Sequence, residues 1–210
     1  MARQMYRFGA RFYDAFSGER AVYRAGREAG IELMGLRPGD TVLDLGCGTG
    51  LSFELLVDAV GPSGQVIGLD ASAQMLQVAA KRVARSGWTN VRVVQADATQ
   101  IHSDDLAVDG VSAQIDAVFS AYALSVIGNH NTVLGRAELL LVSGGLMGIV
   151  DMQRPDGPAA IFAPLARLAC ALGGSNIEAH PWTWLEQRGH NLKKTSRRGG
   201  HIQVVVGILR

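Results

Sequence analysis

The chain has 210 residues, of which 48% are hydrophobic and 19% are charged, and its formal net charge is +1. This length and composition favour one globular domain and exclude a disordered chain. The near-neutral charge gives no general attraction to nucleic acid, so we expect no nucleic-acid partner. Two cysteines make no disulfide framework or metal motif, and no apolar run is long enough to span a bilayer. Because the N-terminus also lacks a cleavable signal pattern, we expect a cytoplasmic protein.

Helical patterns and apolar strand-like runs alternate along the chain. Residues 1–36 have a helical pattern, and further helices are expected at 51–60, at 72–86 with Ser72 as N-cap, and from Asn131 to a stop at Gly144 and Gly145. The expected strands cover residues 41–45, 65–70, 91–96, 115–120 and 145–151. Residues 99–114 are polar and are expected to form a connecting loop with some helix. This alternation predicts a parallel sheet with helices on both faces.

The last part of the chain has a different pattern. A helix is expected at 158–172 and a shorter one at 181–188, and two strand-like runs at 191–198 and 201–209 flank the pair Gly199 and Gly200. These two runs predict an antiparallel hairpin that follows the parallel strands.

A glycine-rich turn follows the first expected strand. Gly46, Gly48 and Gly50 stand on alternate positions, and a helical pattern begins at once. Strand, glycine turn and helix together make room for a nucleotide at the carboxyl edge of a sheet, because glycine allows close approach and positive φ. The spacing is neither the G-x-G-x-x-G dinucleotide fingerprint nor a phosphate-binding P-loop. Asp44, just before the turn, would repel a diphosphate and attract a cationic amine.

A second acid narrows the expected ligand further. Asp70 ends the second expected strand, about 20 residues after the turn, where an acidic side chain can bind both ribose hydroxyls. The turn follows an acid and contains no basic residue, and a second acid ends the second strand. This combination predicts an uncharged or cationic nucleoside as ligand.

These motifs resemble those of the class I S-adenosylmethionine-dependent methyltransferases. Residues 42–50 match the first motif of that family and residues 66–70 the second, and the resemblance extends from about Leu36 to Asp151. It implies S-adenosylmethionine as cofactor and S-adenosylhomocysteine as product. It also implies an α/β fold with a Rossmann-like, doubly wound, mostly parallel seven-stranded sheet and a C-terminal antiparallel hairpin. Residues 37–210 would form this domain, and residues 1–36 a helical cap or lid.

The same resemblance assigns cofactor-binding roles to individual positions. Those at the methionine end are Asp44, Gly46, Cys47, Gly48, Gly50 and Ser120. Those at the ribose and the adenine are Asp70, Ala71, Met75, Asp97 and Ala98, with Asp97 bonding the adenine amine. Met75 is equally well explained as helix core, and Cys47 as a small filler of the turn. No metal is expected, since sulfonium chemistry needs no Lewis acid and no His, Cys, Asp or Glu set has ligand spacing.

The methyl acceptor is expected above the fourth and fifth strands, near Tyr122 and Asp151. Our two catalytic candidates are His130 and Tyr13. His130 could take a proton from a hydroxyl or ammonium group, although a solvated loop histidine explains it too. Tyr13 and the following acid resemble a tyrosine-aspartate pair of the ubiquinone-methyltransferase-like branch, in which the N-terminal helix folds over the cofactor.

Two aromatic or amphipathic segments have alternative explanations. His180, Trp182 and Trp184 would either roof an acceptor pocket or, as we favour, seat the terminal hairpin. The first helix carries an apolar stripe and six arginines against two acids over residues 1–27. Such a helix either lies in a membrane interface or packs on the domain with a solvated charged face. The stripe consists of Met5, Phe8, Phe12 and Phe16.

Within the family, the chain is most similar to bacterial phosphatidylethanolamine and ubiquinone/menaquinone methyltransferases. The segments that carry this likeness include residues 38–40, 60–64, 87–91 and 122–127, whereas Gly128, Asn129 and His130 replace a usual proline-aspartate. The leading hypothesis is a methyltransferase for a lipid amine or another small amphiphile. The alternatives are an O-methyltransferase for a soluble hydroxylated metabolite and a cofactor-binding regulatory protein without turnover. A homo-oligomer and peripheral membrane contact through the N-terminal helix remain open.

Overall fold

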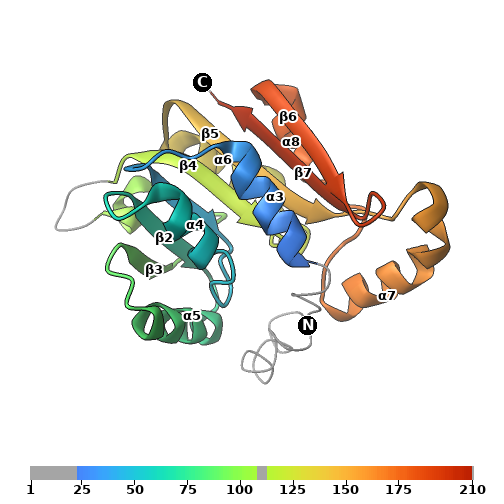
Figure 1. Ribbon diagram of the computed structural model, residues 1–210, viewed down its shortest axis with the longest axis horizontal. Coiled ribbons are helices and arrows are strands. Elements are labelled where there is room, and N and C mark those ends of the chain that lie inside the picture. Colours follow the sequence, from blue (N-terminus) through green and yellow to red (C-terminus); the bar gives the residue numbers. More distant parts are fainter. Residues whose placement is uncertain (1–22, 108–112, 210) are drawn as a thin grey trace.

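The computed structural model describes residues 23–107 and 113–209, and it has one seven-stranded sheet (Figure 1). The strand order is β3-β2-β1-β4-β5-β7-β6. The first five strands pair in parallel, and β7 is antiparallel to β5 and to β6. The strands are β1 (Thr41–Leu45), β2 (Gln65–Asp70), β3 (Val91–Gln95), β4 (Ile115–Ala121), β5 (Leu141–Met152), β6 (His190–Arg197) and β7 (Ile202–Ile208). The predicted mostly parallel seven-stranded sheet with a C-terminal antiparallel hairpin is therefore confirmed, and its last strand lies beside β5.

Helices cover both faces of the sheet (Figure 1). On one face lie α3 (Arg24–Met34), α4 (Phe53–Val60) and α5 (Ala73–Ser86), and on the other α6 (His130–Leu140) and α8 (Trp182–Arg188). The short helices are η2 (Ser103–Leu106) and η3 (Gly157–Phe162), and η3 leads directly into α7 (Ala163–Leu172). The central strands are apolar on both sides because both sides are covered.

The terminal hairpin is anchored by two tryptophans of α8. Trp182 and Trp184 are each 6% exposed and share a core cluster with Val205 and Leu209, near the end of the chain. Burial of two such large rings stabilises the contact between α8 and the sheet. The interpretation that these tryptophans seat the hairpin is supported by this packing.

Helix α3 lies unusually close to the sheet. A Cβ atom at Gly26 would collide with the hydroxyl of Tyr122, and one at Gly30 would lie 2.6 Å from a methyl group of Val150. The absence of these two side chains lets the helix backbone approach β4 and β5. Helix α3, which belongs to the predicted lid of residues 1–36, is packed into the core in this way, and residues 1–22 of that segment, including Tyr13, lie outside the described residues.

The segment after β4 differs from the sequence expectation. Helix α6 begins at His130 with Asn129 as N-cap, and it ends at Leu140, directly before β5. The predicted cap at Asn131 and the predicted helix end at Gly144 are therefore wrong. Gly144 instead has φ +77° within the long strand β5, where the pairing with β4 shifts in register. A glycine at such a shift relieves backbone strain. The predicted cap at Ser72 is confirmed, since its Oγ accepts from the backbone N–H of Met75.

Candidate active site

The glycine turn after β1 is held by backbone hydrogen bonds. The N–H groups of Gly46 and Cys47 both donate to the carbonyl of Leu69, at 2.8 and 2.9 Å. Gly46, Gly48 and Gly50 have φ values of +74°, +55° and +77°, in the left-handed region that favours glycine. A Cβ at Gly46 would strike the side chain of Ala123, whereas one at Gly48 would meet no described residue within 4 Å apart from its chain neighbours. The turn thus leaves open space beside Gly48.

Asp70 links this turn to the start of α5. Its Oδ2 accepts from the N–H of Gly48 at 2.9 Å, and its Oδ1 accepts from the N–H of Ser72 at 2.8 Å. Burial raises the pKa of Asp70, and backbone donors including Ser72 and Gly48 oppose that rise. Each carboxylate oxygen can accept more than one hydrogen bond, so the side chain is oriented and still able to bind ribose hydroxyls.

Asp44 is a buried carboxylate with an unsatisfied oxygen. It lies in β1, is 1% exposed, and its Oδ2 has no hydrogen-bond partner among the described residues. Burial raises its pKa to about 7, the positive charge of Arg27 lowers it, and the charge of Asp70 raises it further. A buried carboxylate without a donor is costly unless a ligand supplies one. A cationic amine, such as that of the methionine moiety of S-adenosylmethionine, fits this requirement.

The other predicted cofactor residues lie around the same edge of the sheet. Met75 is 4% exposed in the first turn of α5, and Ala98 is 7% exposed after β3. Asp97 is exposed, and its Oδ1 accepts from the backbone N–H and the hydroxyl of Thr99. The hydroxyl of Ser120 donates to the carbonyl of Leu45, which ties β4 to β1. The structure thus brings the predicted residues of β1, β2, β3 and β4 to one edge.

The last two predicted positions differ in burial, since Ala71 is exposed and Cys47 is buried. Ala71 directly follows Asp70 between β2 and α5. Cys47 is 8% exposed, and burial raises the pKa of its thiol well above the ordinary value. Because the thiolate is the reactive form, this shift disfavours reaction at the thiol.

Tyr122 occupies a strained position directly after β4. Its φ is +60°, which is costly for a residue with a bulky side chain, and its hydroxyl donates to the carbonyl of Tyr23 at 2.8 Å. The guanidinium of Arg27 lies 4.9 Å from the centre of the Tyr122 ring. Strain of this kind concentrates at functional sites, so Tyr122 remains a candidate on the acceptor side.

Asp151 lies near the end of β5, where the sequence predicts the acceptor site. It is fully buried, and its carboxylate accepts from the N–H groups of Ser125 and Met152, both at 2.9 Å. Burial raises its pKa to about 6. Because Ser125 belongs to the segment between β4 and α6, Asp151 positions that segment next to the edge that carries Asp44.

The remaining catalytic candidates are less well defined by the structure. His130 is the first residue of α6 and is partly buried, which lowers the pKa of its imidazole. Tyr13 lies outside the described residues.

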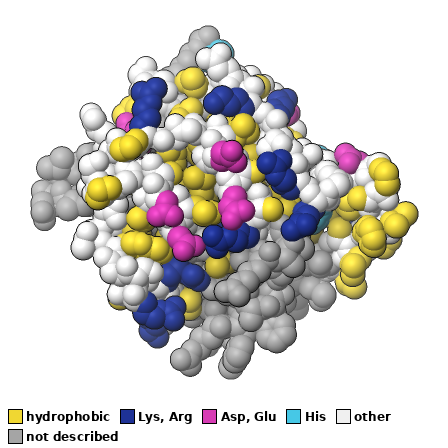
Figure 2. Space-filling model, viewed as in Figure 1, with side chains coloured by type: hydrophobic (Ala, Val, Ile, Leu, Met, Phe, Trp, Pro, Cys, Tyr) yellow, Lys and Arg dark blue, Asp and Glu magenta, His cyan; other side chains and the backbone are white. Residues whose placement is uncertain are grey.

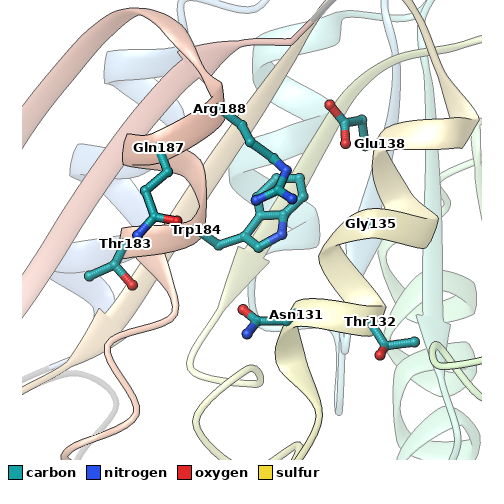
Figure 3. Close-up of a pocket in the computed structure, with 8 residues that line it drawn as sticks. All are labelled: Asn131, Thr132, Gly135, Glu138, Thr183, Trp184, Gln187 and Arg188. Carbon is teal, nitrogen blue, oxygen red and sulfur yellow. The ribbon is translucent and has the colours of Figure 1, made fainter.

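A pocket next to His130 along the chain is formed by α6 and α8 (Figure 3). Asn131 and Glu138 line it from α6, and Trp184 and Arg188 from α8, with the guanidinium of Arg188 4.8 Å from the centre of the Trp184 ring. Its lining comes from the helices opposite α3, so it is separate from the glycine turn.

Helix α7 presents an apolar face outward, next to the acceptor side. Four large side chains of η3 and α7 are between 57% and 77% exposed, and Figure 2 shows hydrophobic side chains gathered at the right edge, where α7 lies in Figure 1. They are Ile161, Phe162, Leu165 and Leu168. The inner face carries Ala166 and Cys170, which pack with Met152 and Ile177 and with the rings of Tyr23 and Tyr122. The inner face of α7 thus packs next to the predicted acceptor side, whereas the four large side chains point outward.

Sequence analysis missed one residue of this edge. Arg27 enters the sequence analysis only as one of the six arginines of residues 1–27, yet it is 8% exposed and faces Asp44 and Tyr122. The available clue was its place between Gly26 and Gly30, since glycines four apart on a helix indicate a face in close contact with a neighbour.

The described residues contain neither a membrane-spanning helix nor a metal-binding cluster. Within 23–107 and 113–209, no helix is both long and apolar enough to cross a membrane. In the same part of the chain, no group of three or more His, Cys, Asp or Glu side chains is arranged to hold a metal ion.

Comparison with known proteins identifies the family. Residues 36–190 match a family model described as a methyltransferase domain. A ubiquinone/menaquinone biosynthesis C-methyltransferase of Ectopseudomonas mendocina is 32% identical over 69% of this chain, which spans 54% of that relative. A demethylmenaquinone methyltransferase of Staphylococcus aureus is 27% identical over 88% of this chain and 77% of its own length.

Solved structures share the fold. A SAM-dependent methyltransferase from Aquifex aeolicus aligns with a TM-score of 0.69 at 19% identity, over 100% of this chain and 99% of its own. A phosphoethanolamine N-methyltransferase of Haemonchus contortus, solved with S-adenosylhomocysteine, aligns with a TM-score of 0.69 at 18% identity, over 93% of this chain and 46% of its own.

Proposed function

This chain belongs to the class I S-adenosylmethionine-dependent methyltransferases, and we propose that it methylates a small amphiphile with a hydroxylated aromatic head and an apolar tail. The observation that carries this proposal is the outward apolar face of η3 and α7. Large hydrophobic side chains gathered on a surface mark a site of interaction with an apolar partner. The inner face of the same helix packs near Tyr122, so we infer that an acceptor head at the sheet edge has its tail along α7.

The proposed head group follows from the sequence relatives. Two of them are named as enzymes of quinone methylation, and one aligns with most of this chain. The reduced, hydroxylated form of such a ring is a carbon nucleophile once its hydroxyl loses a proton. S-adenosylmethionine, when bound, supplies the electrophilic methyl group.

His130 is our proposed base for the acceptor hydroxyl. Burial lowers the pKa of this imidazole, which favours the neutral form that accepts a proton at neutral pH. Its position at the first residue of α6 acts in the same direction, because the N-terminus of a helix disfavours a cation. Tyr13 remains a second proposed catalytic residue.

The lipid amine of our leading hypothesis is kept as an alternative, because its acyl chains suit the same apolar face. A soluble hydroxylated metabolite is the other alternative, and it would leave the apolar face of α7 without a role in acceptor binding.

Substitutions on α7 test the proposal. We expect Leu165→Gln combined with Leu168→Gln to raise KM at least several-fold for a demethylated quinol that carries a prenyl tail. KM for the same head group without a tail should not change. The matched control is Leu139→Gln, since Leu139 is 78% exposed on α6 and lies away from this surface. Equal KM values for the tailed quinol in wild type and double variant would contradict the proposed role of α7.

A further inference from the structure

Asp44 and Arg27 face the same side of the sheet. Side chains alternate along a strand, so Asp44 points to the same face as Val42, which packs in the core cluster beneath α3. Arg27 reaches this region from α3 itself, and its guanidinium lies over the ring of Tyr122. Because Asp44 pairs in register with Phe119 of β4, only three residues before Tyr122, the two charges converge near the carboxyl edges of β1 and β4.

Both charges are buried at a cost to the fold. Arg27 is 8% exposed and Asp44 is 1% exposed, and removing ions from water is expensive unless they are well paired. The unsatisfied oxygen of Asp44 indicates that the protein alone does not complete this arrangement. A ligand that carries both an ammonium and a carboxylate would complement an acid and a base placed in this way.

We propose that Arg27 binds the carboxylate of the cofactor's methionine moiety, while Asp44 binds its ammonium group. A guanidinium suits this task because its fixed N–H fork matches the geometry of a carboxylate. Tyr122 holds the guanidinium from one side through a cation–π contact. Gly26 and Gly30 allow the helix to lie close enough for the arginine to reach the edge.

Arg27 and Asp44 belong to the proposed cofactor end of the site, and their proposed role does not depend on the acceptor. A second arginine near the turn offers a competing assignment. Arg82 of α5 donates from its Nε to the carbonyl of Thr49 at 3.0 Å, and this contact supports the turn. An experiment must therefore distinguish the contribution of Arg27 from that of Arg82. It must also distinguish recognition of the carboxylate from a general contribution to the fold.

Calorimetric titration with two ligands makes this separation. The ligands are S-adenosylhomocysteine and its decarboxylated analogue, which keeps the ammonium group. We expect the wild-type protein to bind the analogue roughly 10- to 100-fold more weakly, since it loses a charge-assisted contact. The affinity ratio is the dissociation constant of the analogue divided by that of S-adenosylhomocysteine. In Arg27→Met this ratio should fall to about one, because S-adenosylhomocysteine should then bind as weakly as the analogue binds to the wild-type protein.

Two variants serve as controls. Arg24→Met removes an exposed arginine of the same helix, which pairs with Glu28 and Glu54, and it should keep the wild-type ratio. Arg27→Lys keeps the charge but not the fork, so the ratio should be reduced and remain above one. If Arg27→Met does not fold, the ratios measured for the wild-type protein and for Arg27→Lys still test whether Arg27 binds the carboxylate.

Three results would overturn the assignment. A wild-type ratio near one would show that no residue recognises the carboxylate. If Arg27→Met weakens the binding of both ligands equally and leaves the ratio unchanged, Arg27 only supports the position of Tyr122 and does not bind the carboxylate. A ratio that collapses in Arg82→Met and persists in Arg27→Met would move the role to Arg82.

Discussion

Asp44 illustrates, at the scale of single residues, how a binding group opposes folding. Burial raises its pKa in the folded protein to about 7, from an ordinary value of 3.8. Above pH 7 the folded state must carry a buried charge that the unfolded state solvates freely. Below the ordinary pKa both states are protonated and the penalty disappears.

We therefore predict that Asp44→Asn stabilises the ligand-free protein. The free energy of unfolding should rise by up to about 4 kcal/mol at pH 8, and the gain should shrink as pH falls from 7 towards 4. The groups that set this window are Asp44 itself, Arg27 and Asp70. Urea unfolding at a series of pH values measures it. The variant should bind S-adenosylhomocysteine more weakly, because the amine loses its anionic partner.

The control for this prediction is Asp58→Asn, on the exposed face of α4. It should leave the pH dependence of stability as in wild type. A gain for Asp44→Asn that is equally large at pH 4 and at pH 8 would show that ionisation of Asp44 is not the cause.

At the scale of elements, the glycine turn contains one glycine that the fold requires and one that leaves space for a ligand. A Cβ at Gly46 collides with Ala123, whereas one at Gly48 enters open space, and both positions have positive φ. We predict that Gly46→Ala lowers the free energy of unfolding by more than about 2 kcal/mol, from strain and collision. Gly48→Ala should cost only the strain of about 1 kcal/mol.

The affinity for S-adenosylhomocysteine provides a second test at Gly48. The open space beside Gly48 lies where the cofactor is expected, so Gly48→Ala should bind S-adenosylhomocysteine at least ten-fold more weakly while remaining folded. Thermal unfolding and calorimetry on the same samples give both quantities. Wild-type affinity in Gly48→Ala would place the cofactor elsewhere.

The elements differ in how far sequence could predict them. The turn after β1, the strands and the Ser72 cap depend on local pattern, so residues such as Gly46 and Asp70 were placed correctly from sequence. The boundary between α6 and β5 was not placed correctly. A glycine such as Gly144 is typical both of a helix end and of a register shift within a strand, and the sequence alone does not distinguish them. Arg27 could not be placed either, since its burial depends on contact between α3 and distant strands.

At the scale of the whole molecule, the role of residues 1–22 remains a proposal. Helix α3 packs on β5 and β7 from Arg24 onward, so deletion of residues 1–18 should leave a cooperatively folding domain. If those residues form the proposed lid with Tyr13, the deletion should abolish turnover, because a lid must close for transfer. Circular dichroism melting and production of S-adenosylhomocysteine measure the two properties. Full activity in the deleted protein would contradict the lid.

A membrane role for the same segment is tested separately. The four arginines of residues 1–22 should bring the intact protein to anionic vesicles, with binding that falls as salt rises. Lost turnover in the deletion, without vesicle binding of the intact protein at low salt, would keep the lid and reject the membrane contact.

The central claim is methyl transfer from S-adenosylmethionine to an amphiphile, and label transfer tests it most directly. The protein is incubated with methyl-labelled S-adenosylmethionine and a mixture of a prenylated demethylquinol, phosphatidylethanolamine vesicles and a soluble phenol, and each compound is then analysed by mass spectrometry. We predict label in the quinol, in a one-to-one ratio with S-adenosylhomocysteine. Label only in the soluble phenol, or no label despite tight binding of S-adenosylhomocysteine, would contradict the account.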